Sequence, residues 1–232
     1  MKAQDASARE RLLRAALKHF AERGYAGASV QDIVDDAKVT KPTLYYYFGN
    51  KAGLYHALID LAYDERLRLL QESVIQAGPS LEAQLISLIQ AQFEFARRNR
   101  ELMRIGFATM FAAPREVPNP AYCLARAQRN FNFVVQLVRE AQQRREIDPA
   151  LDATEATLAI YGMMAFHVLA HLANPDHGLN QTRAQFITRV FLQGLHGAQA
   201  ASRQKSTPAP PPRRRAIHRK SPPAFRRSAP GR

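Results

Sequence analysis

The chain has 232 residues, of which 46% are hydrophobic, enough for a sizeable core in one or two domains. Its 33 lysines and arginines outnumber its 20 acidic residues, giving a formal net charge of +13. Ten of these cations and no acid fall in residues 203–232, so the remaining residues carry only +3 and are not broadly basic. The single cysteine, Cys123, excludes a framework of intramolecular disulfides.

The first predicted helix runs from Ser7 to Arg23. Gly24 follows it and is expected to end it in the left-handed conformation that glycine adopts readily. Apolar residues recur at the helical period of about 3.6 residues, at Leu12, Leu13, Ala16, Leu17, Phe20 and Ala21.

Two short amphipathic segments around a three-residue turn follow, over residues 29–48. Ser29 is predicted to cap the first segment, with Asp32 completing a capping box. Residues 38–40 make the turn, and Thr40 is predicted to cap the second segment. Pro42 lies in the first turn of that segment, where its missing N–H is not needed.

The second segment divides its side chains sharply between two faces. Leu44 and Phe48 are predicted to point inward. The outward side chains are Lys41, Thr43, Tyr45, Tyr46 and Tyr47. Such a face suits phosphates and base edges better than solvent, so the pattern predicts a helix-turn-helix whose second helix reads DNA. A generic helical pair with tyrosines in its core is the alternative.

A further helix is predicted to start after Asn50, its cap, and to continue to Ala77, before Gly78 and Pro79. Lys51 stands at its first position. Backbone N–H groups and a lysine at a helix start together form a phosphate clamp. An ordinary solvated lysine is the alternative.

Residues 10–55 contain four short motifs in succession: F-x-x-x-G-Y, S-V-x-x-I, V-T-x-x-T-L-Y-x-Y-F and N-K-x-x-L. They lie in the stretch ALKHFAERGYAGASVQDIVDDAKVTKPTLYYYFGNKAGL. In this combination they resemble the N-terminal DNA-binding domain of the TetR family of bacterial transcriptional regulators. The resemblance covers about a fifth of the chain.

The resemblance implies a role for each matching position. Ser29 and Lys51 are expected to bind phosphate, and Tyr45 and Tyr47 to reach the DNA backbone. The residues expected to face the major groove are Thr40, Lys41, Pro42, Thr43 and Tyr46. Pro42 departs from the glycine that many relatives carry there.

Downstream helices are predicted over residues 81–98, 100–111, 121–145, 153–173 and 182–201. The fold class is therefore all-α with about nine helices: a three-helix DNA-binding domain over 1–52 and a helical effector-binding and dimerisation domain over 53–202. Residues 203–232 hold seven of the 14 prolines and are expected to form a disordered basic tail.

The resemblance also implies a cavity for a small effector among helices 81–98, 100–111, 121–145 and 153–173. Its apolar lining would favour a large apolar or aromatic molecule, with Arg104 or Arg115 available for an anionic group. Plain core packing is the alternative for each lining residue. The candidate lining residues are Phe93, Met103, Phe107, Met110, Phe111, Tyr122, Phe131, Met163 and Phe166.

In the family, the last two helices pair with their twins in a dimer, which implies a homodimer on a near-palindromic operator of double-stranded DNA. The residues that suit close helix approach are Ala159, Met163, Phe166, Ala170, Phe186, Val190, Phe191, Gly194, Leu195 and Gly197.

Three other features of the sequence give weaker indications of function. His167 and His171 have a spacing compatible with metal binding, but no third ligand is evident, so we expect no metal site. An unpaired buried Cys123 is expected to be inert. No apolar run approaches about 18 residues, and the N-terminus lacks the apolar core of a signal peptide. We therefore expect no membrane partner and a cytoplasmic location.

Three function classes follow. The first is a transcriptional repressor released from its operator by a small effector. The second is a constitutive DNA-binding regulator or activator whose large domain only dimerises or binds a protein partner. The third is an enzyme on a helical scaffold. No catalytic triad order, glycine-rich phosphate loop or metal signature supports catalysis, so we expect neither an enzyme nor a cofactor.

Overall fold

The computed structural model describes residues 7–113 and 116–205, with side chains described up to residue 194. Within these ranges the chain forms nine helices and no strand, which confirms the expected all-α fold class. The disordered tail expected over 203–232 is wrong for residues 203–205, which are helical; residues 206–232 lie outside the described residues, as do Arg115 and the side-chain environments of Leu195 and Gly197. The helices are α1 (Ala8–Gly27), α2 (Val30–Asp36), α3 (Lys41–Phe48), α4 (Lys51–Ala77), α5 (Leu81–Arg98), α6 (Arg100–Met110), α7 (Pro120–Gln143), α8 (Ala153–Ala173) and α9 (Gln181–Lys205).

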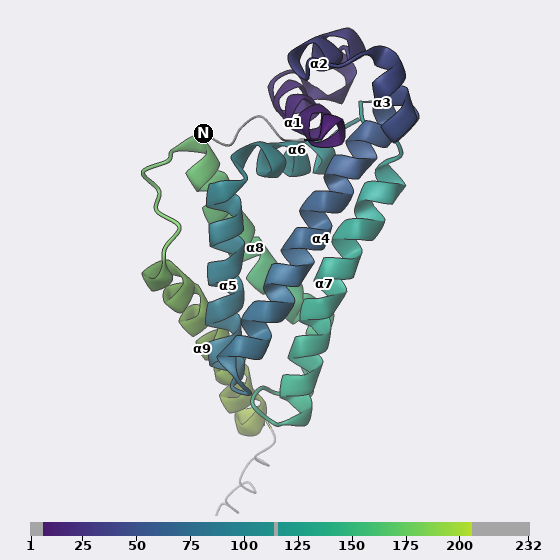
Figure 1. The fold of residues 1–232 in the computed structure, drawn as a ribbon. Helices are drawn as coiled ribbons and strands as arrows, with labels where there is room; N and C mark the ends of the chain where they lie inside the picture. Colours follow the sequence, from purple (N-terminus) through teal and green to yellow (C-terminus); the bar gives the residue numbers. More distant parts are fainter. Residues whose placement is uncertain (1–6, 114–115, 206–232) are drawn as a thin grey trace, which may run out of the picture.

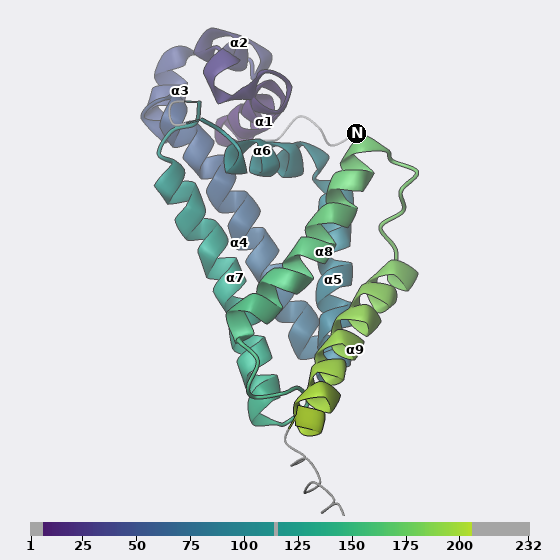
Figure 2. The same ribbon diagram turned by 180° about the vertical axis from the view of Figure 1, so that it is seen from behind.

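Helices α1 to α3 form a small head at one end of an elongated helical body (Figure 1). Helix α4 leaves the head and runs down the body beside α7, while α6 lies crosswise beneath the head against α1. Helices α8 and α9 cover the opposite side of the body, as the reverse view shows (Figure 2). The head is therefore carried by two helices of the body, α4 and α6.

Capping interactions explain where the head helices begin. The Ser7 hydroxyl accepts from Glu10 N, and the Glu10 carboxylate accepts from Ser7 N, a complete capping box at α1. Ser29 caps α2 by accepting from Gln31 N at 3.1 Å. The capping box predicted with Asp32 is wrong, because that carboxylate pairs instead with Arg23 at 2.6 Å.

Four residues, 37–40, join α2 to α3, one more than the three-residue turn predicted over 38–40. Lys38 adopts a positive φ of 53°, and Val39 N donates to Val34 O at 3.0 Å. Thr40 holds the N-cap position of α3 but makes no side-chain capping bond. Thr40 is thus the N-cap residue as predicted, but its hydroxyl lies 2.9 Å from that of Thr43 and does not bind a backbone N–H.

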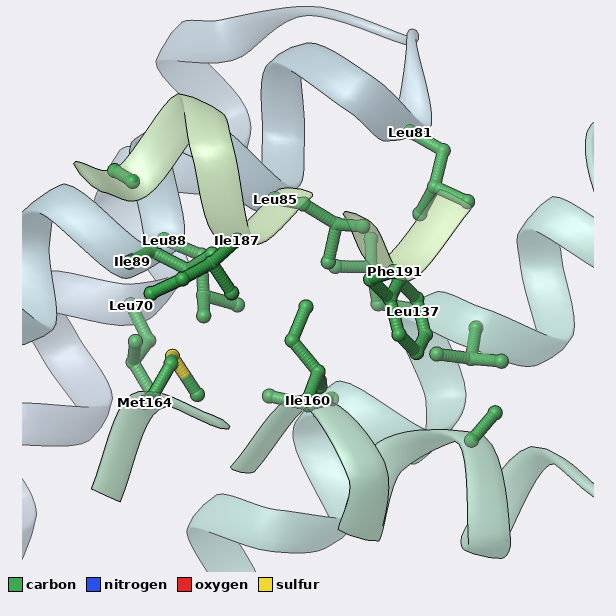
Figure 3. Close-up of a cluster of buried hydrophobic side chains, with 14 of the residues drawn as sticks. Leu70, Leu81, Leu85, Leu88, Ile89, Leu137, Ile160, Met164, Ile187 and Phe191 are labelled. Atoms are coloured by element: carbon green, nitrogen blue, oxygen red, sulfur yellow. The ribbon is translucent and has the colours of Figure 1, made fainter. Parts of the chain in front are cut away.

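Two hydrophobic clusters form the core, and α4 belongs to both. The head cluster contains Leu54 and Leu58 of α4 together with α1 to α3, and it extends to Ile105 of α6. The body cluster contains Leu70 of α4 and gathers α5, α7, α8 and α9. Figure 3 shows this cluster, with Leu85, Leu88, Ile89, Leu137, Ile160, Met164, Ile187 and Phe191 converging between the helices. The boundary proposed between residues 52 and 53 thus falls in the first turn of a continuous helix.

Helix α8 is long and apolar enough to cross a membrane by length and composition, with a mean hydropathy of 1.5. The expectation that no such run exists is therefore wrong; residues 156–173 contain no Asp, Glu, Lys or Arg. One face of α8 supplies Ile160, Met164 and Val168 to the body cluster. This packing gives the helix a role inside the folded body.

Candidate nucleic-acid interface

Helix α3 presents an aromatic face to solvent. Leu44 is fully buried and anchors the helix in the head, whereas Tyr46 is 84% exposed and Tyr45 and Tyr47 are also exposed. The rings of Tyr46 and Tyr47 meet edge to face, with centroids 5.1 Å apart. Three neighbouring rings and no acidic side chain on one short helix form a surface able to stack on sugars and contact base edges.

The remaining residues predicted for DNA contact on α3 share this surface. Thr40, Lys41 and Pro42 are exposed, and Thr43 is half-buried, with its hydroxyl 2.9 Å from that of Thr40. Arg9 of α1 lies over the Phe48 ring, 5.6 Å from its centroid, and adds a cation behind the C-terminal end of α3. Arg9 could not be predicted from the sequence, because only the fold brings α1 next to α3.

Close backbone contact sets the angle between α3 and α4. Gly49 has a φ of 73° and ends α3, after which Asn50 Oδ1 accepts from Gly53 N at 2.8 Å and caps α4. At Gly53 an added Cβ would lie 2.0 Å from the Phe48 carbonyl oxygen. A side chain at residue 53 is therefore incompatible with the present position of α3.

Lys51 is not free at the head surface. Its Nζ donates to Tyr25 O at 2.8 Å and to Ala28 O at 2.9 Å, and lies 4.5 Å from the centre of the Tyr25 ring. Burial lowers the pKa of this lysine. In this arrangement the ammonium binds carbonyl groups at the end of α1. It does not project into solvent as the phosphate clamp predicted from the sequence would.

The two predicted phosphate contacts nevertheless lie together. Because Lys51 Nζ donates to the carbonyl of Ala28, its ammonium lies beside the residue that precedes the exposed Ser29. The Lys51 side chain thus links the first turn of α4 to the residue before the N-cap of α2. Backbone N–H groups at such helix starts favour an anionic group.

The residues predicted to line an effector cavity are scattered over the body. Phe93 is part of the core, and Met103, Phe107, Phe131 and Met163 pack against it. Met110 and Phe111 are exposed at the end of α6. Tyr122 donates to Asp60 at 2.7 Å, between α7 and α4. Phe166 is 74% exposed on α8. Of these residues, Met163 and Phe166 alone line a surface hollow between α8 and α9.

The outer face of α8 and α9 carries an apolar surface. Its exposed side chains are Leu158, Phe166, Leu169, Phe186 and Val190. Phe166, Phe186 and Val190 also line a hollow of about 390 Å³ between the two helices, together with Gly162, Met163, His167 and Ile187. Of the other residues predicted for dimerisation, Ala159 and Gly194 are exposed, Ala170 is half-buried, and Phe191 lies in the core.

The two histidines with metal-compatible spacing are engaged by hydrogen bonds within the chain. His167 Nδ1 lies 3.1 Å from His177 Nε2 and 3.3 Å from Arg183, and His171 Nδ1 lies 2.9 Å from the His177 carbonyl oxygen. Within the described ranges no group of three or more His, Cys, Asp or Glu residues is arranged to hold a metal ion. These contacts instead join α8 to the loop before α9.

Cys123 is buried in the head cluster at the start of α7. Burial, together with the charge of Asp60, raises the pKa of its thiol. The thiolate is the reactive form of cysteine, so this environment disfavours reaction.

Comparison with known proteins agrees with this geometry. Residues 12–58 match the family of bacterial regulatory proteins, tetR family. The uncharacterized HTH-type transcriptional regulator YdgC of Bacillus subtilis is 33% identical over 111 residues, which are 46% of this chain and 56% of YdgC. The chain therefore spans little more than half the length of this relative. The HTH-type transcriptional regulator UidR of Escherichia coli is 27% identical over 190 residues, 81% of this chain and 92% of UidR.

A solved structure shows the same fold over most of the chain. The transcriptional regulator FadR from Bacillus subtilis, crystallised in complex with stearoyl-CoA, superposes with a TM-score of 0.69 at 20% identity. The superposition covers 81% of this chain and 99% of FadR.

The head and its exposed α3 define a helix-turn-helix protein. Across the head and the start of α4, residues 12–58 resemble the tetR family of bacterial regulatory proteins. This is a family of regulators and not of enzymes.

Proposed function

We propose that the protein is a transcriptional regulator that binds double-stranded DNA through α3. The observation that carries the proposal is the exposed face of Tyr45, Tyr46 and Tyr47 beside Lys41, on a helix whose opposite side is anchored by Leu44. Thr40, Pro42 and Thr43 belong to the same reading surface. Ser29 and the helix starts around Lys51 face the DNA backbone, with Lys51 acting mainly by holding that region together.

The protein acts as a homodimer on a near-palindromic operator. Five large apolar side chains are exposed on α8 and α9, and such a concentration on one face is typical of a protein interface. One α3 helix reads only a short stretch of DNA, so two copies related by two-fold symmetry supply the specificity. This arrangement assigns residues 1–52 to DNA binding and residues 53–202 to dimerisation and effector binding, in the cytoplasm.

A small, largely apolar effector in the helical body releases the protein from DNA. Support comes from the contact between body and head. The Tyr55 and Thr109 hydroxyls, from α4 and α6, lie 2.5 Å apart. Beside them, a hollow of about 230 Å³ lies between α1, α4 and α6. A shift of α6 therefore has room to move α1 and, with it, the reading helix.

Constitutive binding, without an effector, is the alternative function, and the packing of three predicted lining residues supports it. Phe93 is buried, and Phe107 and Phe131 pack directly against the core. An effector must therefore displace side chains or enter beside them. Measuring operator affinity with and without candidate effectors separates the two functions, because a constitutive regulator keeps the same affinity throughout.

The DNA-binding proposal is tested by comparing operator with random DNA. We select the operator from genomic fragments, then titrate both DNA types against wild type, Tyr46→Ala and Thr43→Ala. Each base contact carries roughly 1–3 kcal/mol of discrimination, so both variants should lose specificity. Lys51→Ala should weaken both DNA types equally, since it loosens the head. Unchanged specificity in Tyr46→Ala would exclude that residue from base recognition.

A further inference from the structure

A polar cluster lies inside the helical body, where four helices meet. Arg66 of α4 donates from Nε to Gln92 Oε1 of α5 at 2.8 Å. Asn130 of α7 donates from Nδ2 to the Tyr63 carbonyl oxygen at 3.0 Å, and the Tyr161 hydroxyl of α8 donates to the Asn130 carbonyl oxygen at 3.4 Å. The side chains of Gln92 and Asn130 are almost completely buried. None of these residues was among the predicted effector contacts.

Both buried amides keep one atom without a hydrogen-bond partner in the described part of the protein. Because Gln92 Oε1 accepts from Arg66, the orientation of that amide is set and Nε2 is left as an unpaired donor. Because Asn130 Nδ2 donates to Tyr63, its Oδ1 is left as an unpaired acceptor. Burying unpaired polar atoms costs free energy, and such atoms call for a partner that the chain itself does not supply.

Arg66 also lacks a counter-charge among the described residues, in contrast to its neighbours. Asp60 and Asp64 of the same helix pair with Arg126 and Arg129 of α7. These acids are thereby engaged, and Arg66 keeps only the neutral Gln92 as a partner. Its charge opposes the rise in the pKa of Tyr63 and Tyr161 that burial produces, so the guanidinium acts on both phenols.

The surroundings of the cluster combine access with an apolar wall. Arg66 and Tyr63 are half-buried, so the cluster is exposed to solvent in part on its α4 side. The Phe131 and Tyr161 rings meet edge to face beside Asn130, with centroids 5.5 Å apart. An unpaired cation, an amide donor and an amide acceptor thus lie next to aromatic rings.

We propose that Arg66, Gln92 and Asn130 bind the polar end of the effector, a carboxylic acid that also carries a hydroxyl group. The carboxylate pairs with Arg66 and accepts from Gln92 Nε2, the hydroxyl donates to Asn130 Oδ1, and the apolar part packs against Phe131 and Tyr161. This inference rests on the proposed function, in which the body binds an effector, and it names the chemical class of that effector.

Calorimetric titration of the full-length protein with three hydroxylated aromatic acids and their methyl esters tests the proposal. The probes are salicylate, mandelate and para-hydroxyphenylacetate. The ester keeps the ring and the hydroxyl but removes the charge. At least one acid should bind about tenfold more tightly than its ester, a difference of about 1.4 kcal/mol. Across the panel, acids that bind no better than esters overturn the proposal and indicate that water alone fills the cluster.

Variants decide whether Arg66 is the origin of the preference. Arg66→Met should abolish the preference for acid over ester, and Arg66→Lys should restore part of it, which excludes misfolding as the cause. Arg126→Met is the matched control, since it removes an arginine that already pairs with Asp60, and it should keep the preference. Retention of the preference in Arg66→Met overturns the assignment.

Operator binding measured in the same samples separates this inference from the proposed function. An acid that binds through Arg66 but leaves DNA affinity unchanged supports the site and contradicts release by effector. An ester that releases DNA as well as its acid supports effector release and contradicts the carboxylate site.

Discussion

Two predicted DNA contacts, Tyr46 and Lys51, differ in their surroundings in the folded head. The Tyr46 ring is almost wholly in water, as expected of a side chain awaiting a partner. Lys51 is used internally by the carbonyls of Tyr25 and Ala28. Periodicity predicts which side of a helix faces outward, so it placed Tyr46 correctly on the exposed face. It cannot reveal a hydrogen bond to a turn more than twenty residues upstream, and Lys51 was therefore interpreted from its helix position alone.

At the level of single residues, a substitution at Gly53 tests whether close backbone contact fixes α3 against α4. In Gly53→Ala the new Cβ would overlap the Phe48 carbonyl oxygen, 2.0 Å away, so α3 and α4 must separate. We expect a destabilisation of roughly 1–3 kcal/mol and weaker operator binding, measured by urea unfolding and by DNA titration.

The matched control is Gly106→Ala on α6, where an added Cβ meets nothing within 4 Å. Replacing a glycine within a helix by alanine stabilises by roughly 0.5–1 kcal/mol. An equal effect of the two substitutions would show that the contact between Gly53 and Phe48 does not hold the reading helix in place.

At the scale of helices, capping and periodicity predicted most boundaries. The helix predicted over 81–98 is α5, and the helix predicted over 153–173 is α8. Helix α7 ends two residues earlier than predicted, at Gln143, and α9 extends four residues beyond its predicted end, to Lys205. Which helices pack together is not encoded in these local signals. The polar cluster around Arg66 depends on such packing, and so it could not be found from the sequence.

The junction of α8 and α9 predicts a pH dependence of stability. His167 Nδ1 lies within hydrogen-bond distance of an Arg183 donor and of His177, so it must be unprotonated to accept. Burial, with the charge of Arg183, lowers the pKa of His167 and of His177. His171 and Arg100 are the other basic groups here, and Arg100 lies 3.5 Å from His171.

Because the pKa values of His167 and His177 are lower in the folded protein, the unfolded chain binds more protons than the folded one. The free energy of unfolding should therefore fall as pH drops below about 6.5.

Urea unfolding at about pH 7.5 and about pH 5.5 measures this loss. Glutamine keeps an acceptor for Arg183 but does not titrate, so His167→Gln should flatten the dependence. If the wild type and His167→Gln lose stability in parallel, other groups account for the pH response.

At the scale of the whole molecule, net charge is concentrated in the last 30 residues of the sequence. Residues 203–232 contribute +10 of the formal +13. We predict that they add non-specific DNA affinity. Counterion release lowers the logarithm of the binding constant by about 0.9 per neutralised phosphate for each tenfold rise in salt. Engaging even four of these cations should steepen that slope by roughly 3–4 units.

Truncation after Ser202 tests this contribution by operator titration across a range of salt concentrations. Operator specificity should survive while the salt slope becomes shallower. A slope identical to that of the full chain would mean that these cations do not contact DNA.

The continuity of α4 has a mechanical consequence. Its 27 residues extend about 40 Å, at roughly 1.5 Å per residue. If the body end pivots by about 5°, the head end sweeps about 3.5 Å, close to the rise of one base pair, about 3.4 Å. In the proposed homodimer the two-fold axis makes the heads move in opposite directions across that axis, so the mismatch against half-sites about 34 Å apart doubles. The helix then works as a lever arm, and a rotation of a few degrees at its buried end is enough to take both heads out of register with the DNA groove.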